Sequence, residues 1–135
     1  GQPKEGVLEA LALMEAQGLK IGLATSSPFT MVEAVLGKLG IRDRFLAVHS
    51  AEVERFGKPH PDVYIHAAEK LGVEPVHCLA IEDSFTGLLA AKAASMRALI
   101  VPDPALVGDP RLAIADHQLR SLGELNAATL ASWVA

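Results

Sequence analysis

The sequence predicts an α/β domain, with a mainly parallel β-sheet between two layers of helices. Short apolar runs alternate along the chain with longer segments whose apolar residues follow helical spacing. This alternation is typical of βαβ units, which give a parallel sheet with helices on both faces. In addition, polar residues directly follow two of the apolar runs, at Thr25 and at Glu82–Asp83. Ligands bind at the carboxyl edge of open parallel sheets, so a site is expected there.

The elements alternate in a regular order. In chain order, the pattern predicts a helix over about residues 4–17, a strand over 19–24, a helix over 28–39, a strand over 45–48, a helix over 63–71, a strand over 78–82, a helix from 85 to 94, a strand over 97–101, a weak strand over 116–119 and a helix over 127–134. Glycines at 18, 40 and 72 fit helix ends. Ser27 and Ser84 are expected to cap the helices that follow them, with Pro28 as a first helical residue.

Composition narrows the class of protein. The 135 residues are half apolar, which suffices for one domain over residues 1–135 without disulfides, and there is a single cysteine. The net charge of −4, the absence of a basic block and the few aromatic residues argue against nucleic-acid binding. No apolar stretch approaches the roughly 20 residues that span a bilayer. We therefore expect a soluble, cytoplasmic protein that contacts neither nucleic acid nor membrane.

The polar residues near the strand ends suit phosphate and a divalent cation. Thr25, Ser26 and Ser27 lie where a helix begins, and free backbone N–H groups favour anions there. Lys58, in a loop held by two prolines, adds a positive charge. Glu82 and Asp83 offer the hard oxygen ligands that Mg²⁺ prefers. Taken singly, each motif could be only a helix cap or a solvated charge, so only their combination indicates a site.

Three of these motifs occur in the order of a known family. Residues 22–28 (GLATSSP), 58–64 (KPHPDVY) and 81–87 (IEDSFTG) are similar to the second, third and fourth motifs of the haloacid dehalogenase-like (HAD) hydrolases. The chain most resembles the subgroup of β-phosphoglucomutase and 2-deoxyglucose-6-phosphate (hexitol) phosphatases. This resemblance implies a Rossmann-like core and a magnesium-dependent phosphatase that acts on a small phosphorylated sugar through an aspartyl-phosphate.

The resemblance also assigns roles to particular residues. Thr25, Lys58 and Asp83 would be catalytic, and Glu82 and Asp83 would hold the Mg²⁺. Five residues would bind phosphate or substrate: Thr25, Ser26, Ser27, Lys58 and His60. Two of them, Thr25 and Lys58, would also be catalytic. For the five histidines, the sequence shows no metal-ligand spacing, and we expect solvated or packing roles for them.

Two parts of the family's enzyme have no counterpart in these residues. The first motif, an Asp-x-Asp that supplies the nucleophile and the acid/base, does not occur, and neither does the helical cap. The resemblance therefore implies the C-terminal part of a HAD-like core, inactive by itself. The missing first strand would lie between the strands ending at Thr25 and Asp83. We expect that gap to be closed by direct pairing of those strands, by a strand from another copy, or by a separate N-terminal piece.

Other functions stay open at this point. Phosphoryl transfer of the β-phosphoglucomutase type would use the same residues. A non-catalytic fragment could bind only anions or a partner chain. A signalling receiver domain also combines acids, a hydroxyl and a lysine, but its acids come first and its lysine last, whereas here the order is Thr25, Lys58, Asp83.

Overall fold

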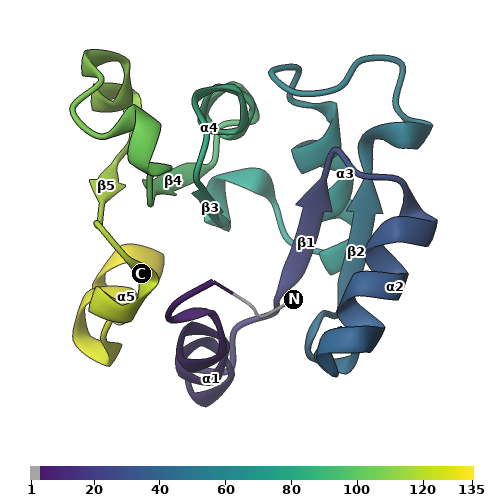
Figure 1. The fold of residues 1–135 in the computed structure, drawn as a ribbon, viewed down its shortest axis with the longest axis horizontal. Coiled ribbons are helices and arrows are strands. Elements are labelled where there is room, and N and C mark those ends of the chain that lie inside the picture. Colours follow the sequence, from purple (N-terminus) through teal and green to yellow (C-terminus); the bar gives the residue numbers. More distant parts are fainter. Residues whose placement is uncertain (1–3) are drawn as a thin grey trace.

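The computed structural model describes residues 4–135 and confirms the α/β fold (Figure 1). Its helices and strands, in chain order, are α1 (Val7–Ala16), β1 (Gly22–Thr25), α2 (Phe29–Leu39), β2 (Ala47–Ser50), α3 (Asp62–Leu71), β3 (Leu79–Glu82), α4 (Phe85–Ala93), β4 (Arg97–Ile100), β5 (His117–Gln118) and α5 (Ala127–Val134). Short 3-10 segments connect several of them. Within the described residues, every helix is too short or too polar to cross a bilayer.

The strands form two separate parallel sheets. β1 pairs with β2, and β3, β4 and β5 form the other sheet in that order. In the first sheet Thr25 lies opposite Ser50, so both strands end at one level. In the second, the pairing continues past Glu82, because the backbone N–H of Asp103 donates to the carbonyl of Asp83. Each sheet therefore presents polar residues at the carboxyl ends of its strands.

Helices cover both faces of the β1–β2 sheet. Leu23 of β1 packs with the cluster that contains Val32 and Leu36 of α2. Its neighbour Ala24 instead packs with the cluster that contains Ala68 of α3. Successive strand residues point to opposite faces, so one strand contributes to two helix layers.

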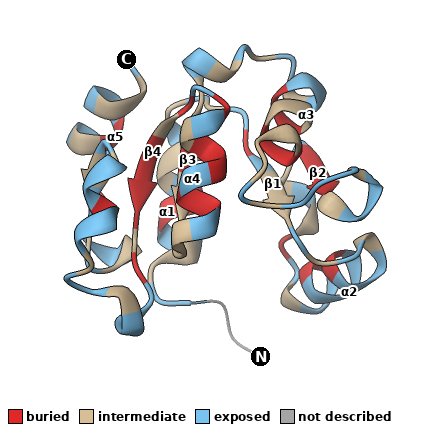
Figure 2. Cartoon of the chain, turned by 90° about the horizontal axis from the view of Figure 1, so that it is seen from above, coloured by how far each residue is buried: buried red, intermediate tan, exposed pale blue. Residues whose placement is uncertain are grey.

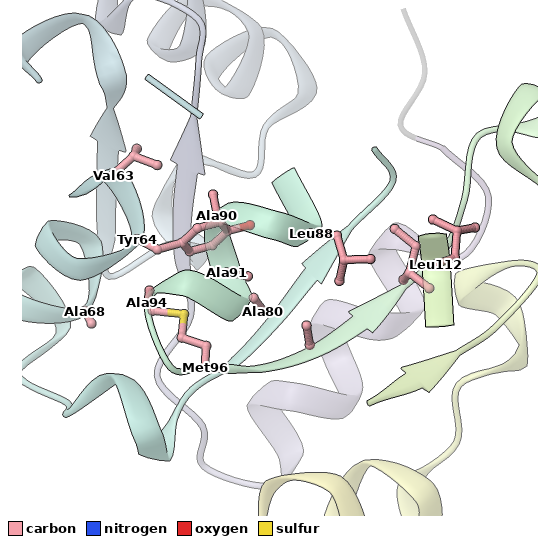
Figure 3. Packing of buried hydrophobic residues seen from close by; sticks show 12 residues of the cluster. Val63, Tyr64, Ala68, Ala80, Leu88, Ala90, Ala91, Ala94, Met96 and Leu112 are labelled. Carbon is pink, nitrogen blue, oxygen red and sulfur yellow. The ribbon is translucent and has the colours of Figure 1, made fainter. Parts of the chain in front are cut away.

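The best-buried core lies between α4 and the second sheet. Figure 2 shows buried residues along α4 and β4, and Figure 3 shows the small side chains at their contact. Ala90 and Ala91 of α4 and Ala98 of β4 are fully buried. Because alanine is small, the helix can lie close to the strands, and larger residues such as Leu88 and Met96 fill the space around them. Ser84 caps α4 as expected, accepting a hydrogen bond from the Gly87 N–H at 3.1 Å.

Several boundaries differ from the sequence prediction by one to three residues; β1, for example, covers Gly22–Thr25 rather than 19–24. β2 covers Ala47–Ser50 rather than 45–48, because its register with β1 extends it over two polar residues whose side chains find partners inside the protein. α2 begins at Phe29, so Pro28 precedes it instead of opening it. Ser27 does not cap this helix; the Phe29 N–H donates to the carboxylate of Glu52 at 3.2 Å instead. The prediction of a Ser27 cap was therefore wrong.

A cavity of about 570 Å³ lies between β1 and β3. Its lining is mainly apolar and includes Leu23 of β1, Leu79 and Ile81 of β3, and Leu11 of α1. Among the described residues, β1 and β3 do not pair with each other. Direct pairing, the first of the three expected ways to close this gap, is thus not what the structure shows. The other two ways stay predictions.

Candidate functional site

A buried ion pair connects the ends of the two sheets. Lys58 Nζ lies 2.6 Å from Glu82 Oε1 at the end of β3, and 3.4 Å from the carbonyl oxygen of Ala24 in β1. The side chains of Lys58 and Glu82 are 12% and 8% exposed. Charges buried this far require close partners, because removing them from water is costly. Lys58 thus supplies a fixed positive charge beside Thr25.

The surrounding residues explain how the Glu82 carboxylate can be buried at the end of β3. Tyr64 of α3 donates its hydroxyl to the same Glu82 oxygen at 2.5 Å. Burial, followed by the charge of Glu82, raises the pKa of Tyr64 well above its ordinary value, so the phenol stays protonated and remains a donor. Gly87 in α4 leaves room for the carboxylate, since a Cβ at that position would overlap Glu82. The glycine of the IEDSFTG motif therefore has a steric role.

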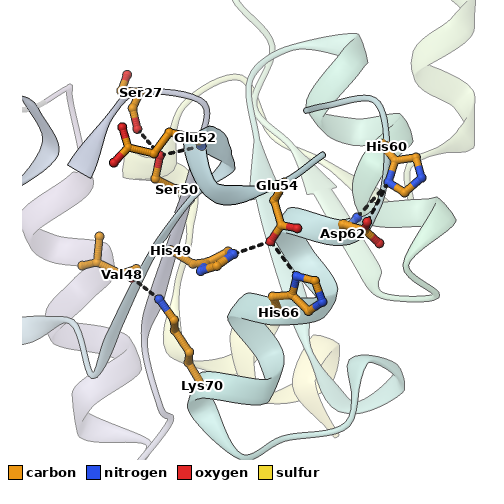
Figure 4. Close-up of polar contacts among 10 residues, drawn as sticks. All are labelled: Ser27, Val48, His49, Ser50, Glu52, Glu54, His60, Asp62, His66 and Lys70. Carbon is orange, nitrogen blue, oxygen red and sulfur yellow. Dashed lines mark hydrogen bonds and ion pairs between the residues drawn. The ribbon is translucent and has the colours of Figure 1, made fainter. Parts of the chain in front are cut away.

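The loop after β1 is held by hydrogen bonds from two sides, and Figure 4 shows those made by Ser50. Thr25 Oγ1 accepts from the Ser27 N–H at 3.0 Å. Ser50, which is fully buried at the end of β2, donates its hydroxyl to the Ser27 carbonyl at 2.6 Å and accepts from the Glu52 N–H at 3.1 Å. Ser26 is exposed at the turn. This arrangement fixes the backbone at the N-terminal side of α2, where anions are favoured.

Asp83 faces a different environment from Glu82. Its carboxylate is half-exposed, and Lys4 Nζ lies 2.7 Å from Oδ2. The same ammonium lies 3.8 Å from Asp103 Oδ1, in the loop after β4. The hydrogen bond to Asp83 raises the pKa of Lys4. Two carboxylates therefore meet at this edge and already attract a cation.

The structure brings some of the predicted site residues together and separates others. Lys58 and Glu82 are in contact, and Lys58 reaches the residue before Thr25. Asp83 pairs with Lys4 rather than with Lys58. His60 lies 3.4 Å from Asp62 and beside the ring of Phe56, without a hydrogen bond to the other predicted residues in the described part of the chain.

Some residues at the site were not found from the sequence. Tyr64 lies in the quoted KPHPDVY motif, but its hydroxyl could be assigned to Glu82 only from the packing of α3. Asp103 follows a strand end, as Asp83 does, and that signal was available in the loop after β4. Ser50 carries a similar signal, because it follows an apolar run that ends at Val48.

The comparisons with known proteins identify the family. The model for "haloacid dehalogenase-like hydrolase" matches residues 1–95. The chain belongs to the haloacid dehalogenase-like hydrolase family. It is 51% identical to "Hexitol phosphatase B" of Escherichia coli (strain K12) over 125 residues, which cover 93% of this chain and 56% of that protein. It is 37% identical to "Beta-phosphoglucomutase" of Bacillus subtilis (strain 168), covering 89% of this chain and 50% of the relative.

A solved structure agrees with this membership in the HAD-like family. The crystal structure of CbbY from Rhodobacter sphaeroides in complex with phosphate superposes with a TM-score of 0.84 at 30% sequence identity. The match covers 93% of this chain and 56% of CbbY. The chain thus spans about half the length of the curated relatives that it matches. The resemblance drawn from the three motifs is confirmed at the level of the family and its fold.

Proposed function

We propose that this chain forms most of the core of a magnesium-dependent phosphatase that acts on a small phosphorylated sugar. The observation that carries the proposal is Lys58, which lies between the ends of β1 and β3 and contacts Glu82. A buried ammonium in that place suits a phosphoryl group bound at the Thr25 loop. The relatives named as a hexitol phosphatase and a β-phosphoglucomutase support the sugar-phosphate class.

The phosphate site in this proposal is built from the loop after β1. The Thr25 hydroxyl and the Ser26 N–H would hold phosphate oxygens, and the Ser27 N–H would exchange its present hydrogen bond to Thr25 Oγ1 for one to phosphate. Lys58 would neutralise part of the phosphate charge. Glu82 holds the Lys58 ammonium in position through the 2.6 Å contact. His60 would contact the substrate from the same loop as Lys58.

The acidic edge beside this loop fits a magnesium ion. The Lys4 ammonium, which lies 2.7 Å from Asp83 and 3.8 Å from Asp103, supports this assignment, because the two carboxylates already pair with one cation. Asp83 would be the principal ligand, because its carboxylate is half-exposed, whereas Glu82 also serves Lys58 and Tyr64. Bound Mg²⁺ would neutralise charge that develops on the phosphoryl group during transfer.

The nucleophile in this proposal is an aspartate outside these 135 residues. Its carboxylate would displace the sugar hydroxyl from phosphorus, and water would then hydrolyse the aspartyl-phosphate. If the phosphoryl group is transferred to a second sugar hydroxyl instead of to water, the reaction is that of a mutase. The 37% identity to a β-phosphoglucomutase supports this reaction as a second candidate.

An activity comparison tests the proposal. Phosphate release from hexitol and hexose phosphates is measured for the 135-residue chain and for the product of the complete gene that encodes it. We expect no turnover by the chain alone, and turnover by the complete product that EDTA abolishes and magnesium restores. Asp83→Asn and Lys58→Met should remove it, while Asp109→Asn, in an exposed pair with Arg111, should not.

Two results would overturn the proposal or part of it. Turnover by the 135-residue chain that disappears in Asp83→Asn would place the nucleophile inside the chain. A complete gene product that binds phosphate but never releases it from any substrate would favour the non-catalytic, anion-binding alternative.

A further inference from the structure

Side chains from β2, from α3 and from the segment between them meet at one point (Figure 4). His49 belongs to β2, Glu54 lies in the segment that leads to Lys58, and His66 belongs to α3. Glu54 Oε1 lies 2.5 Å from both His49 Nε2 and His66 Nδ1. One ligand atom from each residue lies within 4.8 Å of the other two. We call these residues the His-Glu-His cluster.

The cluster is buried on one side and open on the other. The side chains of His49 and Glu54 are each 6% exposed, whereas that of His66 is 41% exposed. A single carboxylate oxygen between two imidazole nitrogens is held by protons on those nitrogens. The hydrogen bond with His49 and then that with His66 keep the pKa of Glu54 low, and Glu54 raises the pKa of His66. A metal ion that binds the cluster would therefore replace the protons that now lie between these three side chains.

We propose that His49, Glu54 and His66 bind one divalent transition-metal ion of the zinc class. Two imidazoles and one carboxylate are ligands that Zn²⁺, Co²⁺ and Ni²⁺ accept, whereas Mg²⁺ prefers oxygen ligands alone. The three ligands leave a fourth position, which faces solvent on the side of His66. This site is separate from the acidic edge at Asp83 and does not depend on the proposed phosphatase activity.

Metal binding requires a small adjustment of the cluster. Zinc binds nitrogen and oxygen at about 2.0–2.2 Å, so tetrahedral ligands lie roughly 3.3 Å apart. The two 2.5 Å contacts must therefore open by about 1 Å or less. Glu54 lies outside the helices and strands, so its carboxylate can withdraw, while the nitrogens of His49 and His66, which lie within 4.8 Å of each other, come to the same spacing by rotation of their side chains.

One feature limits the expected affinity. His49 Nδ1 is buried and has no hydrogen-bond partner among the described residues. A histidine that binds metal through Nε2 carries its proton on Nδ1, and an acceptor there normally strengthens the site by about 10–100-fold. We therefore expect binding weaker than that of a zinc site with a complete outer shell of hydrogen bonds.

The bound ion would connect parts of the chain that matter for the site. It would tie β2 and α3 to the segment that leads from Glu54 to Lys58. An ion that binds only the folded protein stabilises it by RT ln(1 + c/Kd), where c is the concentration of free ion, so the Tm should keep rising with zinc concentration above the Kd.

A titration of the purified, metal-free protein tests the site. Calorimetry with Zn²⁺ should give one ion per chain, and Co²⁺ should give the visible absorption of a tetrahedral site with nitrogen ligands. Glu54→Gln and His66→Ala should each weaken binding by about 10-fold or more. The matched controls His77→Ala, at an exposed histidine outside the cluster, and Asp83→Asn should keep it.

Each remaining outcome also decides the proposal. His66 is partly exposed, so His66→Ala should stay folded by circular dichroism and keeps the test valid if Glu54→Gln unfolds. Absence of zinc binding by the wild-type protein would overturn the proposal. Binding that is equally strong in the folded His66→Ala variant, or that is lost in Asp83→Asn, would place the ion elsewhere and overturn it as well.

Discussion

At the scale of single residues, Lys58 and Glu82 are the pair on which the proposed site depends. Each is almost completely buried, and each would be an isolated charge without the other. Tyr64 satisfies the same carboxylate oxygen from α3. This arrangement fixes the ammonium beside Thr25 without leaving its charge uncompensated.

Removing Lys58 should therefore destabilise the fold as well as the site. Lys58→Met leaves Glu82 buried with only the Tyr64 hydroxyl, and breaking a buried pair in this way costs about 3–5 kcal/mol. Urea denaturation measures the loss. Adding Glu82→Gln removes the orphaned charge and should restore part of the stability. Equal unfolding free energies for the wild type and Lys58→Met would contradict this account.

A second residue-scale prediction concerns pH in the metal-free protein. The hydrogen bond with His49 holds the folded pKa of Glu54 below its ordinary value of 4.5, so its contribution is present above that value and is lost as the pH falls through the folded pKa. Glu54, then the charges of Glu69 and Asp62, raise the pKa of His66 above its ordinary 6.5. That contribution is complete below 6.5 and is lost as the pH rises through the raised folded value.

The combined contribution should be largest between 4.5 and 6.5. Because His66 is partly exposed, its share should be under about 1 kcal/mol. The Tm is measured in EDTA from about pH 4 to about pH 9 for the wild type and for His66→Ala. The difference between them should shrink toward alkaline pH. A difference that stays constant over the whole range would show that the pair with Glu54 does not form.

At the scale of elements, periodicity predicted the order and type of the helices and strands. Gly40 and Gly72 end helices with positive φ, as expected, and Ser84 caps α4. The end of β2 was missed because the apolar run stops at Val48. The polar groups that form hydrogen bonds with the side chains of His49 and Ser50 can be identified only in the folded protein. Contacts between side chains that are far apart in the chain, such as Glu54 with His66, have no periodic signal.

The packing of α4 against β3 yields a prediction with an internal control. Gly87→Ala would place a Cβ onto the Glu82 carboxylate, which Lys58 and Tyr64 hold in place, so we expect a loss of about 1–3 kcal/mol. Gly37→Ala in α2 meets no atom within 4 Å and should stabilise the protein by about 0.5–1 kcal/mol. Thermal unfolding of both variants measures the two shifts. Equal shifts would mean that Glu82 moves aside freely.

At the scale of the whole molecule, the three motifs predicted the family, and the comparisons confirm it. The motifs could not predict how the chain deals with the gap between its two sheets. That outcome depends on the balance between unpaired strand edges and the packing of α1 and α3 around them. The structure keeps the two edges apart, with the apolar cavity between them.

The last prediction follows from that cavity. Its walls are mainly apolar, and each backbone group left unpaired and buried costs about 1–3 kcal/mol. Unpaired strand edges also attract other strands. We therefore expect the protein to associate with a second copy or to retain a separate strand in the gap, which light scattering and intact mass together detect.

Ile81→Lys, which places a charge in the cavity lining, should weaken that association, whereas Val107→Lys, at an exposed loop position, should not. Circular dichroism checks that both variants fold. A monomer at every concentration, whose two sheets stay apart around a water-filled gap, would contradict the prediction.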